Sequence, residues 1–439
     1  MKFLYSDSLD YVDPNYDFIN DESSVNRKKY LDDQYAHEIM DSTPYDGLLV
    51  AISAIKTVPG AVASKTKYST AEEQLFLRKG ARSFLRFNSA QHLGKMVMGD
   101  CGSFAYANHK KPAFEPDEVV DFYSSAGFTH GTHPDHIIFN FDINDPSKNE
   151  IGEDVLFRYN ITLSNAEKFL KITKKQKENF EPIGVVQGWS PKSMAQAAKK
   201  LEKMGYEYIA IGGLVPLKPE DIHLILRAIK NEIKPTTKIH LLGFAKADYI
   251  FDFIKYDITS FDSTAPLIMA FKDSKRNYFV STTEKKLDYY TAIRIPQFEN
   301  TKLMSAMKSG LLSPNLVRNQ ETKALNSLRG FDQGNVSLET TVENILDYLK
   351  SFLLASDSNP ESRFKKELKI TNQLIRTLKD SPWKNCSCSI CRTIGVEVMI
   401  FRASNRNKRR GFHNLSIYHD HVQKMTKLSN QMDLSNANL

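Results

Sequence analysis

Short apolar runs alternate with amphipathic segments through much of the chain. Each run is bounded by turn or helix signals, and the runs cover residues 48–53, 83–87, 95–99, 136–141, 183–187, 208–212, 239–243 and 258–262. Continuous apolar runs of this length are typical of strands that are buried on both faces of a parallel sheet. Eight such strands alternating with helices predict an α/β fold, a closed (β/α)8 TIM barrel.

Helical signals separate several of these runs. Ser190 and Pro191 form an N-cap with proline in the first turn, and Gly205 follows the last apolar position of that helix. Two further helices are predicted to begin at Pro219 and Ala247. Helices between successive apolar runs are the crossovers that parallel strands require.

Three of the four cysteines in the chain lie close together near the C-terminus. Cys386, Cys388 and Cys391 are followed by His413. Three thiolates and one imidazole make up the tetrahedral ligand set of a closed, structural Zn²⁺ site. The alternative is three buried cysteines that pack as small apolar side chains. The clustering of so scarce a residue favours the metal.

The apolar pattern changes after Asp262. Residues 272–335 are rich in lysine, asparagine and serine, whereas 337–380 carry apolar positions at helical spacing. We therefore expect an N-terminal arm or lid over 1–45, the barrel over 46–271, a largely helical insertion over 272–383, a zinc-binding subdomain over 384–422 and a polar tail over 423–439.

Composition places the chain among ordinary globular proteins, with 41% hydrophobic and 25% charged residues. No apolar run is long enough to span a membrane, and the N-terminal residues lack the apolar core of a signal peptide. Clustered cysteines with metal-ligand spacing suit a reducing compartment. We therefore expect a cytoplasmic protein.

The net charge of +7 allows a nucleic-acid partner, and basic residues are concentrated between the last clustered cysteine and His413. A basic run is usually a solvated face, but one held against a metal module is a better candidate for binding phosphates. The predicted phosphate contacts are Arg402, Arg406, Lys408, Arg409 and Arg410.

Polar residues and glycines follow the predicted strands, where a barrel places its active site. They are Asp100, Asp142, Gln187, Gly212, Gly213, Gly243 and Asp262. Any single aspartate could instead cap the next helix. Two carboxylates facing one pocket suit glycosidic-bond chemistry, one as nucleophile and the other as acid or base. Glycines let the backbone approach a flat ligand, and an amide beside a carboxylate matches a guanine-like edge.

These motifs resemble those of the tRNA-guanine transglycosylase family. The matching segments, in chain order, are GDCGSF from Gly99, FD from Phe141, VVQG from Val185, IGGL from Ile211, LG from Leu242, SFDS from Ser260, and the three cysteines with HNL from His413. The resemblance implies that Asp262 is the nucleophile and Asp100 the general acid/base. It also implies that the base is bound by Asp142, Gln187, Gly212, Gly213, Leu214 and Gly243, and Zn²⁺ by Cys386, Cys388, Cys391 and His413.

The chain departs from the tRNA enzymes of this family at several positions. Trp189 stands where the family has glycine, Val215 where it usually has alanine, and Asn144 where it often has cysteine. The segment between Asp262 and Cys386 is far longer than in the tRNA enzymes, and their Pro-Thr-Arg segment is not recognisable. These departures count against tRNA recognition. Within the family, GDCGSFAY from Gly99, FY from Phe122 with GF from Gly127, and HPDH from His133 most resemble the DNA-modifying 7-deazaguanine transglycosylase branch (DpdA).

That branch implies exchange of guanine in DNA for 7-cyano-7-deazaguanine through a covalent aspartyl-nucleotide intermediate. The first alternative is the same base exchange on tRNA. The second is a non-catalytic zinc-containing subunit that binds nucleic acid, although such a subunit has no need of paired carboxylates. An unrelated zinc-module nucleic-acid binder would leave the eight apolar runs unexplained. A homodimer and a helper protein that opens the duplex both stay open.

Overall fold

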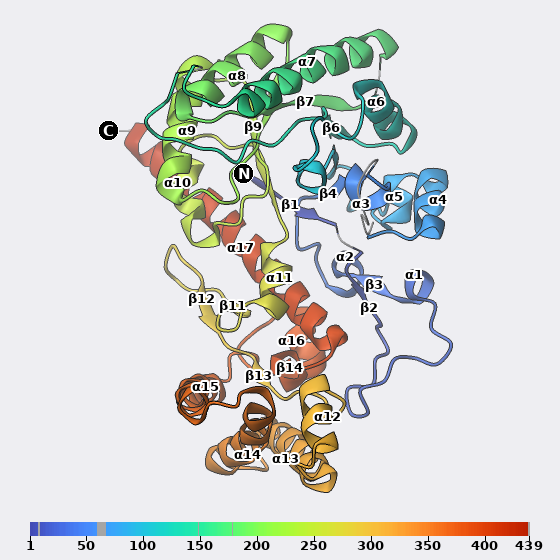
Figure 1. Cartoon of the computed structure of the whole chain (residues 1–439), viewed down its shortest axis with the longest axis vertical. Coiled ribbons are helices and arrows are strands. Elements are labelled where there is room, and N and C mark those ends of the chain that lie inside the picture. Colours follow the sequence, from blue (N-terminus) through green and yellow to red (C-terminus); the bar gives the residue numbers. More distant parts are fainter. Residues whose placement is uncertain (8, 59–66, 148, 178, 438–439) are drawn as a thin grey trace. The chain divides into compact units, whose positions relative to one another are not determined.

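The computed structural model describes residues 1–7, 9–58, 67–147, 149–177 and 179–437. The chain forms two compact units. The first contains Met1–Leu9, Tyr45–Thr264 and His421–Leu439, and the second contains Asp10–Pro44 and Ala265–Asp420. Each unit is described by itself below, with the element labels of Figure 1.

The first unit is a closed barrel of eight parallel strands, so the predicted fold class is confirmed. The strands are β1 (Lys2–Ser6), β4 (Gly47–Ala51), β5 (Met96–Asp100), β6 (His130–Thr132), β7 (Glu181–Val186), β8 (Tyr208–Ile211), β9 (Lys238–Leu241) and β10 (Ser260–Ser263). Every strand pairs with its neighbour in parallel, and β1 pairs with both β10 and β4.

Three predicted boundaries in this unit are wrong. The first barrel strand is β1, inside the expected arm, and its residues Phe3 and Leu4 are fully buried. Residues 83–87 include the end of α5 (Ala81–Phe84), because a short apolar run suits a buried helix as well as a strand. Residues 136–141 follow β6, and there the N–H groups of His136 and Ile138 donate to side chains instead of to a neighbouring strand.

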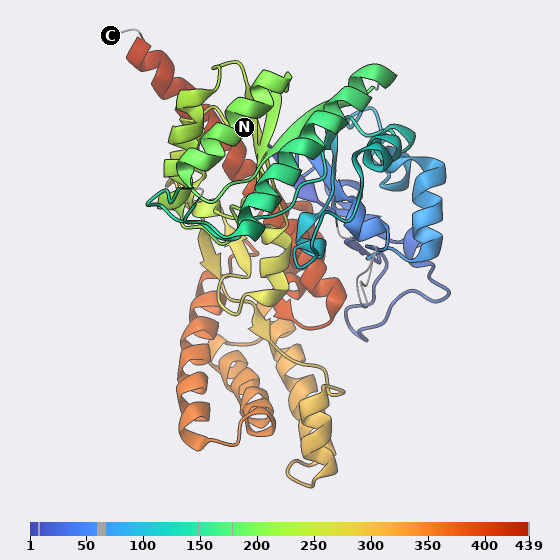
Figure 2. The same cartoon turned by 45° about the horizontal axis from the view of Figure 1, so that its top comes forward.

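Helices flank the strands on the outside of the barrel (Figures 1 and 2). They are α3 (Ile52–Ile55), α4 (Thr70–Lys79), α5, η1 (Ser103–Tyr106), α6 (Pro116–Ser125), α7 (Glu153–Gln176), α8 (Pro191–Met204), α9 (Pro219–Glu232), η2 (Ala247–Tyr249) and α10 (Ile250–Ile254). The predicted start of α8 is confirmed, because Ser190 Oγ accepts the N–H of Ser193.

Large side chains from five of the strands meet in the barrel interior, among them Leu4, Leu49, Met98, Ile183, Val185 and Tyr208. Tyr123 of α6 covers the outer side of β5 and β6. Its ring occupies the positions where a Cβ on Gly99 or Gly131 would lie, at 2.2 and 2.3 Å from ring carbons. These two glycines let α6 pack closely on the strands that lead to Asp100.

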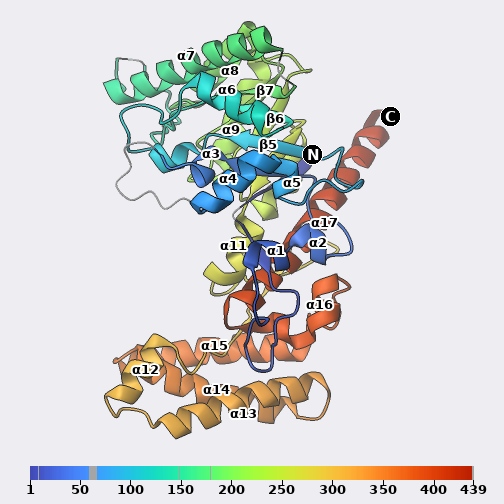
Figure 3. The same cartoon turned by 90° about the vertical axis from the view of Figure 1, so that its right-hand side faces the viewer.

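The second unit combines small two-stranded sheets with helices. Its elements are β2 (Tyr11–Val12), α1 (Lys29–Asp32), β3 (Gln34–Tyr35), α2 (Ala36–Ile39), α11 (Ala265–Lys272), β11 (Tyr278–Val280), β12 (Asp288–Tyr290), β13 (Ile293–Arg294), α12 (Thr301–Lys308), α13 (Pro314–Asp332), α14 (Leu338–Ser356), α15 (Pro360–Asp380), α16 (Ser389–Ile394), η3 (Gly395–Met399), β14 (Ile400–Phe401) and the first half of α17 (Ser404–Ala437). Helices α13 and α14 lie side by side, and α15 packs on α14 (Figure 3).

The two helices expected over 337–380 are confirmed as α14 and α15. The expected polar tail is wrong as a separate segment, because α17 continues through it to Ala437. The remaining part of the expected arm, Asp10–Pro44, belongs to the second unit. Among the described residues, no helix combines the length and the apolar character that crossing a bilayer would need.

Candidate active site

Asp262 ends β10 at the carboxyl end of the barrel and is buried. Its carboxylate accepts three hydrogen bonds. Ser6 Oγ donates to Oδ2 at 2.6 Å, and the N–H of Gly243 donates to Oδ1 at 2.8 Å. His240 Nε2 lies 3.2 Å from the same Oδ1. Three donors from β1, β9 and the loop after β9 hold the carboxylate in one orientation and stabilise its charge.

A chain of buried hydrogen bonds leads from Asp262 into the barrel. His240 Nδ1 lies 2.5 Å from Ser260 Oγ, which in turn lies 2.5 Å from the hydroxyl of Tyr208. Because a carboxylate only accepts, we assign the donor hydrogen to Nε2 of His240. Nδ1 then accepts from Ser260, and Ser260 accepts from Tyr208. The sequence motifs did not identify His240, because it lies inside β9 and not at its end.

Asp100 ends β5, and two strands, β1 and β4, lie between β5 and β10 in the closed order of the barrel. Its carboxylate accepts the N–H of Gly102 at 2.8 Å and the hydroxyl of Thr132 at 3.1 Å. Burial and the charge of Asp262 raise the pKa of Asp100 above its usual range. A carboxyl group with a raised pKa is suited to exchanging a proton near neutral pH.

Gln187 follows β7, is buried, and has its amide engaged on both sides. Its Nε2 donates to Asp135 Oδ2 at 2.7 Å, and its Oε1 accepts the N–H of Ile138 at 3.2 Å. Asp135 is itself buried, and burial together with the charge of Asp100 raises the pKa of Asp135 to about 7. The mouth of the barrel therefore holds three aspartates, Asp100, Asp135 and Asp262.

The carboxylate beside Gln187 is Asp135, and not Asp142 as the motif comparison predicts. Asp142 is exposed, and its side chain accepts the N–H of Asn144 within its own turn. Asp135 was not identified from the sequence, because a strand was expected over 136–141. With β6 ending at Thr132, the rule that active-site groups follow barrel strands would have included Asp135.

The predicted glycines lie among the same groups. A Cβ on Gly212 would fall 2.3 Å from Gln187 Nε2, and one on Gly213 would fall 3.3 Å from the carbonyl oxygen of Ile138. Gly213 and Gly243 also have positive φ angles, which favour glycine. Leu214 is buried next to them. Glycine is needed here to make room for Gln187 and to aim the N–H of Gly243 at Asp262.

Two exposed phenylalanines stand beside this group. Phe104 belongs to η1, which follows Asp100, and Phe139 follows Asp135. Their ring centroids lie 5.9 Å apart, and about half of each side chain is accessible to solvent. Neither was singled out from the sequence, because a single exposed aromatic residue has no distinctive pattern. Flat apolar faces at the mouth of a site can stack on a base.

A separate cluster in the second unit contains the four predicted metal ligands. His413 Nδ1 lies 3.5, 3.4 and 3.4 Å from the sulfur atoms of Cys386, Cys388 and Cys391. Bonds of about 2.3 Å to sulfur and about 2.0 Å to nitrogen in a tetrahedral site separate such atoms by about 3.5 Å. The other ring nitrogen of His413 is hydrogen-bonded to the carbonyl oxygen of Phe279 at 2.8 Å, which turns Nδ1 toward the thiols. The cluster therefore fits a tetrahedral metal ion.

The basic run has another role than the one predicted. Arg402 and Arg406 are buried in ion pairs. Arg402 is paired with Asp21 and Glu321. Arg406 is paired with Asp21 and Glu397. Arg409 and Arg410 are buried as well and donate to backbone carbonyl groups. Only Lys408 is partly accessible, and it lies 3.8 Å from Asp10. Four of the five predicted phosphate contacts are wrong, because their charged groups are already enclosed.

The comparisons with known proteins identify the family of the chain. The profile of the family described as "Queuine tRNA-ribosyltransferase" (TGT) matches residues 80–428. The chain belongs to this family. It is therefore a pentosyltransferase with guanine transglycosylase activity, and the resemblance inferred from the motifs is confirmed.

Two relatives of this transglycosylase differ greatly in how much of the chain they match. This chain is 38% identical over 435 residues to a "DNA-guanine transglycosylase" of Salmonella montevideo, and the match covers 98% of this chain and 99% of the relative. It is 26% identical over 170 residues to a "tRNA-guanine(15) transglycosylase" of Methanococcus aeolicus, covering 38% of this chain and 24% of that relative.

The hydrogen bond from His240 to Asp262 can be tested with two substitutions. His240→Leu removes the donor, whereas His240→Gln keeps an N–H group near the position of Nε2. A hydrogen bond to a charged group contributes about 1.5–3 kcal/mol, so we expect His240→Leu to lower kcat for guanine exchange roughly tenfold to hundredfold. His240→Gln should retain most of the activity. Equal losses in the two variants would contradict a positioning role that works through this hydrogen bond.

Proposed function

We propose that the enzyme exchanges guanine in DNA for a 7-deazaguanine base, 7-cyano-7-deazaguanine, through a covalent aspartyl-nucleotide intermediate. The main support is that the match to the relative named for DNA, at 38% identity, covers 98% of the chain. The match to the relative named for tRNA covers only 38% of it. The family description favours tRNA as the second candidate substrate.

In the proposed first step, Asp262 attacks C1′ of the target nucleotide. The bond between an Asp262 oxygen and C1′ forms while the bond between C1′ and N9 breaks, and Asp100 supplies the proton that neutralises the departing guanine. In the second step, Asp100 takes the N9 proton of the incoming base. N9 then attacks C1′ and releases Asp262. The donors from Ser6, Gly243 and His240 support the proposed role of Asp262, because they hold the attacking carboxylate in place.

We further propose that Asp135 and Gln187 recognise the base. Guanine and its 7-deaza analogues present adjacent N–H donors beside a carbonyl oxygen. An ionised Asp135 would accept the donors, and the free N–H of Gln187, with the backbone N–H of Gly213, would bind the oxygen. Leu214 and Val215 would lie near the 7-substituent. Phe104 and Phe139 would stack on the base or its neighbour.

The cysteine and histidine cluster is proposed to hold Zn²⁺ as a structural ion. The bound metal would supply a fixed crosslink between α16, the segment before it and α17. Its ligands belong to the second unit, whereas Asp100 and Asp262 belong to the first. The proposed reaction uses groups of the barrel alone.

The proposed function is tested by nucleoside mass spectrometry of DNA and tRNA from cells that express the enzyme and supply the 7-deazaguanine base. We expect the modified nucleoside in DNA digests, and its absence when Asp262→Ala replaces the wild type. Modified tRNA with unmodified DNA would instead establish the second candidate. Denaturing electrophoresis with labelled DNA should detect a covalent adduct with the wild type and none with Asp262→Ala.

Asp135→Asn and Asp142→Asn form a matched pair that tests base recognition. Asparagine at 135 cannot accept two N–H donors, so we expect the KM for the base to rise at least about tenfold, as the loss of charged hydrogen bonds predicts. Asp142→Asn should change the KM for the base little, because the Asp142 side chain is exposed. The opposite order of effects would restore Asp142 as the base ligand.

The raised pKa of Asp135 also predicts a pH dependence. Protonation below about 7 removes the acceptor, so the KM of the wild type should rise as pH falls through that value, and Asp135→Asn should lose this dependence. Without the base, the raised pKa of Asp135 means that the folded state holds the Asp135 proton more tightly than the unfolded state, whose Asp135 pKa is 3.8. The resulting contribution to the free energy of unfolding is fully present at low pH and is lost as pH rises from 3.8 through about 7. Asp135→Asn should therefore lose less thermal stability over that interval than the wild type.

Metal analysis by mass spectrometry tests the zinc proposal. We expect one Zn²⁺ per wild-type chain and a large loss in Cys388→Ser, with a lower Tm, because structural zinc binds with on the order of 10 kcal/mol. Cys101→Ser is the control, since Cys101 lies in the barrel, outside the cluster. A Cys388→Ser protein with unchanged zinc content and Tm would exclude the cluster as the metal site.

A further inference from the structure

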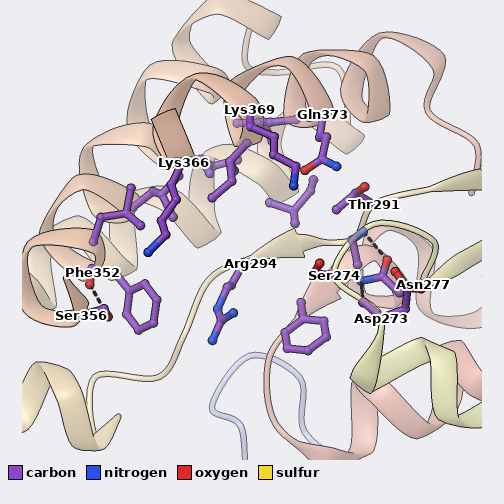
Figure 4. Close-up of a pocket in the computed structure, with 18 of the residues that line it drawn as sticks. Asp273, Ser274, Asn277, Thr291, Arg294, Phe352, Ser356, Lys366, Lys369 and Gln373 are labelled. Carbon is purple, nitrogen blue, oxygen red and sulfur yellow. Dashed lines mark hydrogen bonds between the residues drawn. The ribbon is translucent and has the colours of Figure 1, made fainter. Parts of the chain in front are cut away.

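A pocket of about 630 Å³ lies in the second unit, away from every residue assigned above (Figure 4). Helices α14 and α15 of the insertion form one side of it, and β13, β14 and the segment after α11 form the other. Its size is within the range of small-ligand sites. The proposed base exchange makes no use of it.

The floor of this insertion pocket is apolar. Leu349 and Phe352 of α14, Leu374 of α15 and Ile293 of β13 are buried side chains that line it. Phe401 of β14 also lines it and is partly accessible. A hydrophobic surface with two aromatic rings favours a ligand that has a flat or apolar part.

The rim of the pocket carries an excess of positive charge. Lys272, Arg294, Lys302, Lys366 and Lys369 line it, against a single carboxylate, Asp273. Asp273 already accepts the backbone N–H groups of Lys275 and Arg276. Lys366 is paired with Asp357 at 2.6 Å. Within the described part of the chain, no carboxylate lies within 4.0 Å of the charged nitrogens of the other four cations.

Arg294 is held in place by the aromatic rings. Its guanidinium lies 4.9 Å from the ring centroid of Phe352 and 5.7 Å from that of Phe401. Figure 4 shows its side chain extending from β13 into the same hollow as Lys366 and Lys369 of α15. A guanidinium fixed on two rings keeps its N–H groups free for an anion and loses little side-chain entropy on binding.

A second hollow lies next to the pocket along α15. It is lined by Asn359, Glu361, Ser362, Lys365, Lys366 and Lys369. Lys365 is paired there with Glu361 at 2.6 Å, so Lys369 is the cation of this hollow that adds to the pocket. A series of cations beside an apolar floor matches a polymer that repeats phosphates and flat bases. A free phosphate would leave the apolar floor uncovered, and an apolar ligand would leave the cations unpaired.

We propose that the insertion pocket binds a single-stranded segment of DNA, with phosphates on Arg294, Lys302 and Lys369 and one unpaired base on the floor beside Phe401. The inference rests on the proposed function, because it takes DNA to be the substrate. The insertion would then supply the strand contacts that the buried arginines of α17 do not supply.

The test compares the double variant Lys302→Glu/Lys369→Glu with Lys379→Glu. Lys379 is exposed on the same helix and lines a different hollow, so it controls for a general change of charge. Binding of fluorescein-labelled single-stranded DNA is followed by anisotropy over a range of salt concentrations. We expect the Kd of the double variant to rise at least about tenfold and the slope of log K against log salt to fall by about 1.4, as the loss of two phosphate contacts on a single strand predicts.

The control variant should bind within about twofold of the wild type. An unchanged Kd and salt slope in the double variant, or an equal loss in Lys379→Glu, would overturn the inference. Arg294→Gln provides a second variant if the double variant fails to fold, as judged by circular dichroism, and it should also weaken binding. Unchanged binding by Arg294→Gln would likewise overturn the inference.

Exchange of labelled guanine into the same DNA by the wild type separates the two proposals. Wild-type exchange together with normal binding by the pocket variants overturns the pocket alone. Absence of wild-type exchange into DNA, together with exchange into tRNA, overturns the proposed function and the pocket's role with it.

Discussion

Strand β1 lies between β10 and β4 and closes the barrel. Its register pairs Leu4 with Asp262, which places Ser6 where its hydroxyl reaches the Asp262 carboxylate. Closure of the barrel brings the N-terminal strand beside the last one. The position of Asp262, the proposed nucleophile, therefore depends on long-range pairing between the first residues of the chain and residues 260–263. The buried Phe3 and Leu4 side chains supply the hydrophobic free energy that holds this pairing.

The closed barrel also concentrates negative charge. Asp100, Asp135 and Asp262 lie at the same end of the barrel, and Asp135 and Asp262 are buried. Neighbouring carboxylates disfavour one another's ionised forms. The structure separates their roles through hydrogen bonds. Asp262 receives three donors, whereas burial raises the pKa values of Asp100 and Asp135. In the proposed mechanism, this arrangement keeps Asp262 ready for attack and lets Asp100 and Asp135 change protonation when a base enters or leaves.

Much of the barrel could be predicted because its later strands are continuous apolar runs with clear helix signals between them. β7 to β10 follow that pattern, and Asp262, Gln187 and the glycines stand where the pattern predicts. β1 was not predicted, because it is a three-residue apolar run within the expected arm. The strand expected at 136–141 lies at 130–132, because β6 contains histidine, glycine and threonine. Asp135 was missed for this second reason. The Cys/His cluster was predictable because three of its four residues lie within six positions of the sequence.

The arginines of α17 show why local charge is a weak guide. Their partners Asp21, Glu321 and Glu397 come from three distant parts of the sequence, so no local pattern distinguishes a buried ion network from a solvated basic face. Enclosing four arginines requires these carboxylates and backbone acceptors, since a buried unpaired charge is costly. That requirement removes the basic run from the surface of the second unit. The cations of the insertion pocket differ in this respect, because their charges stay on an accessible rim over an apolar floor, and such an arrangement is suited to a polyanion that also carries flat bases.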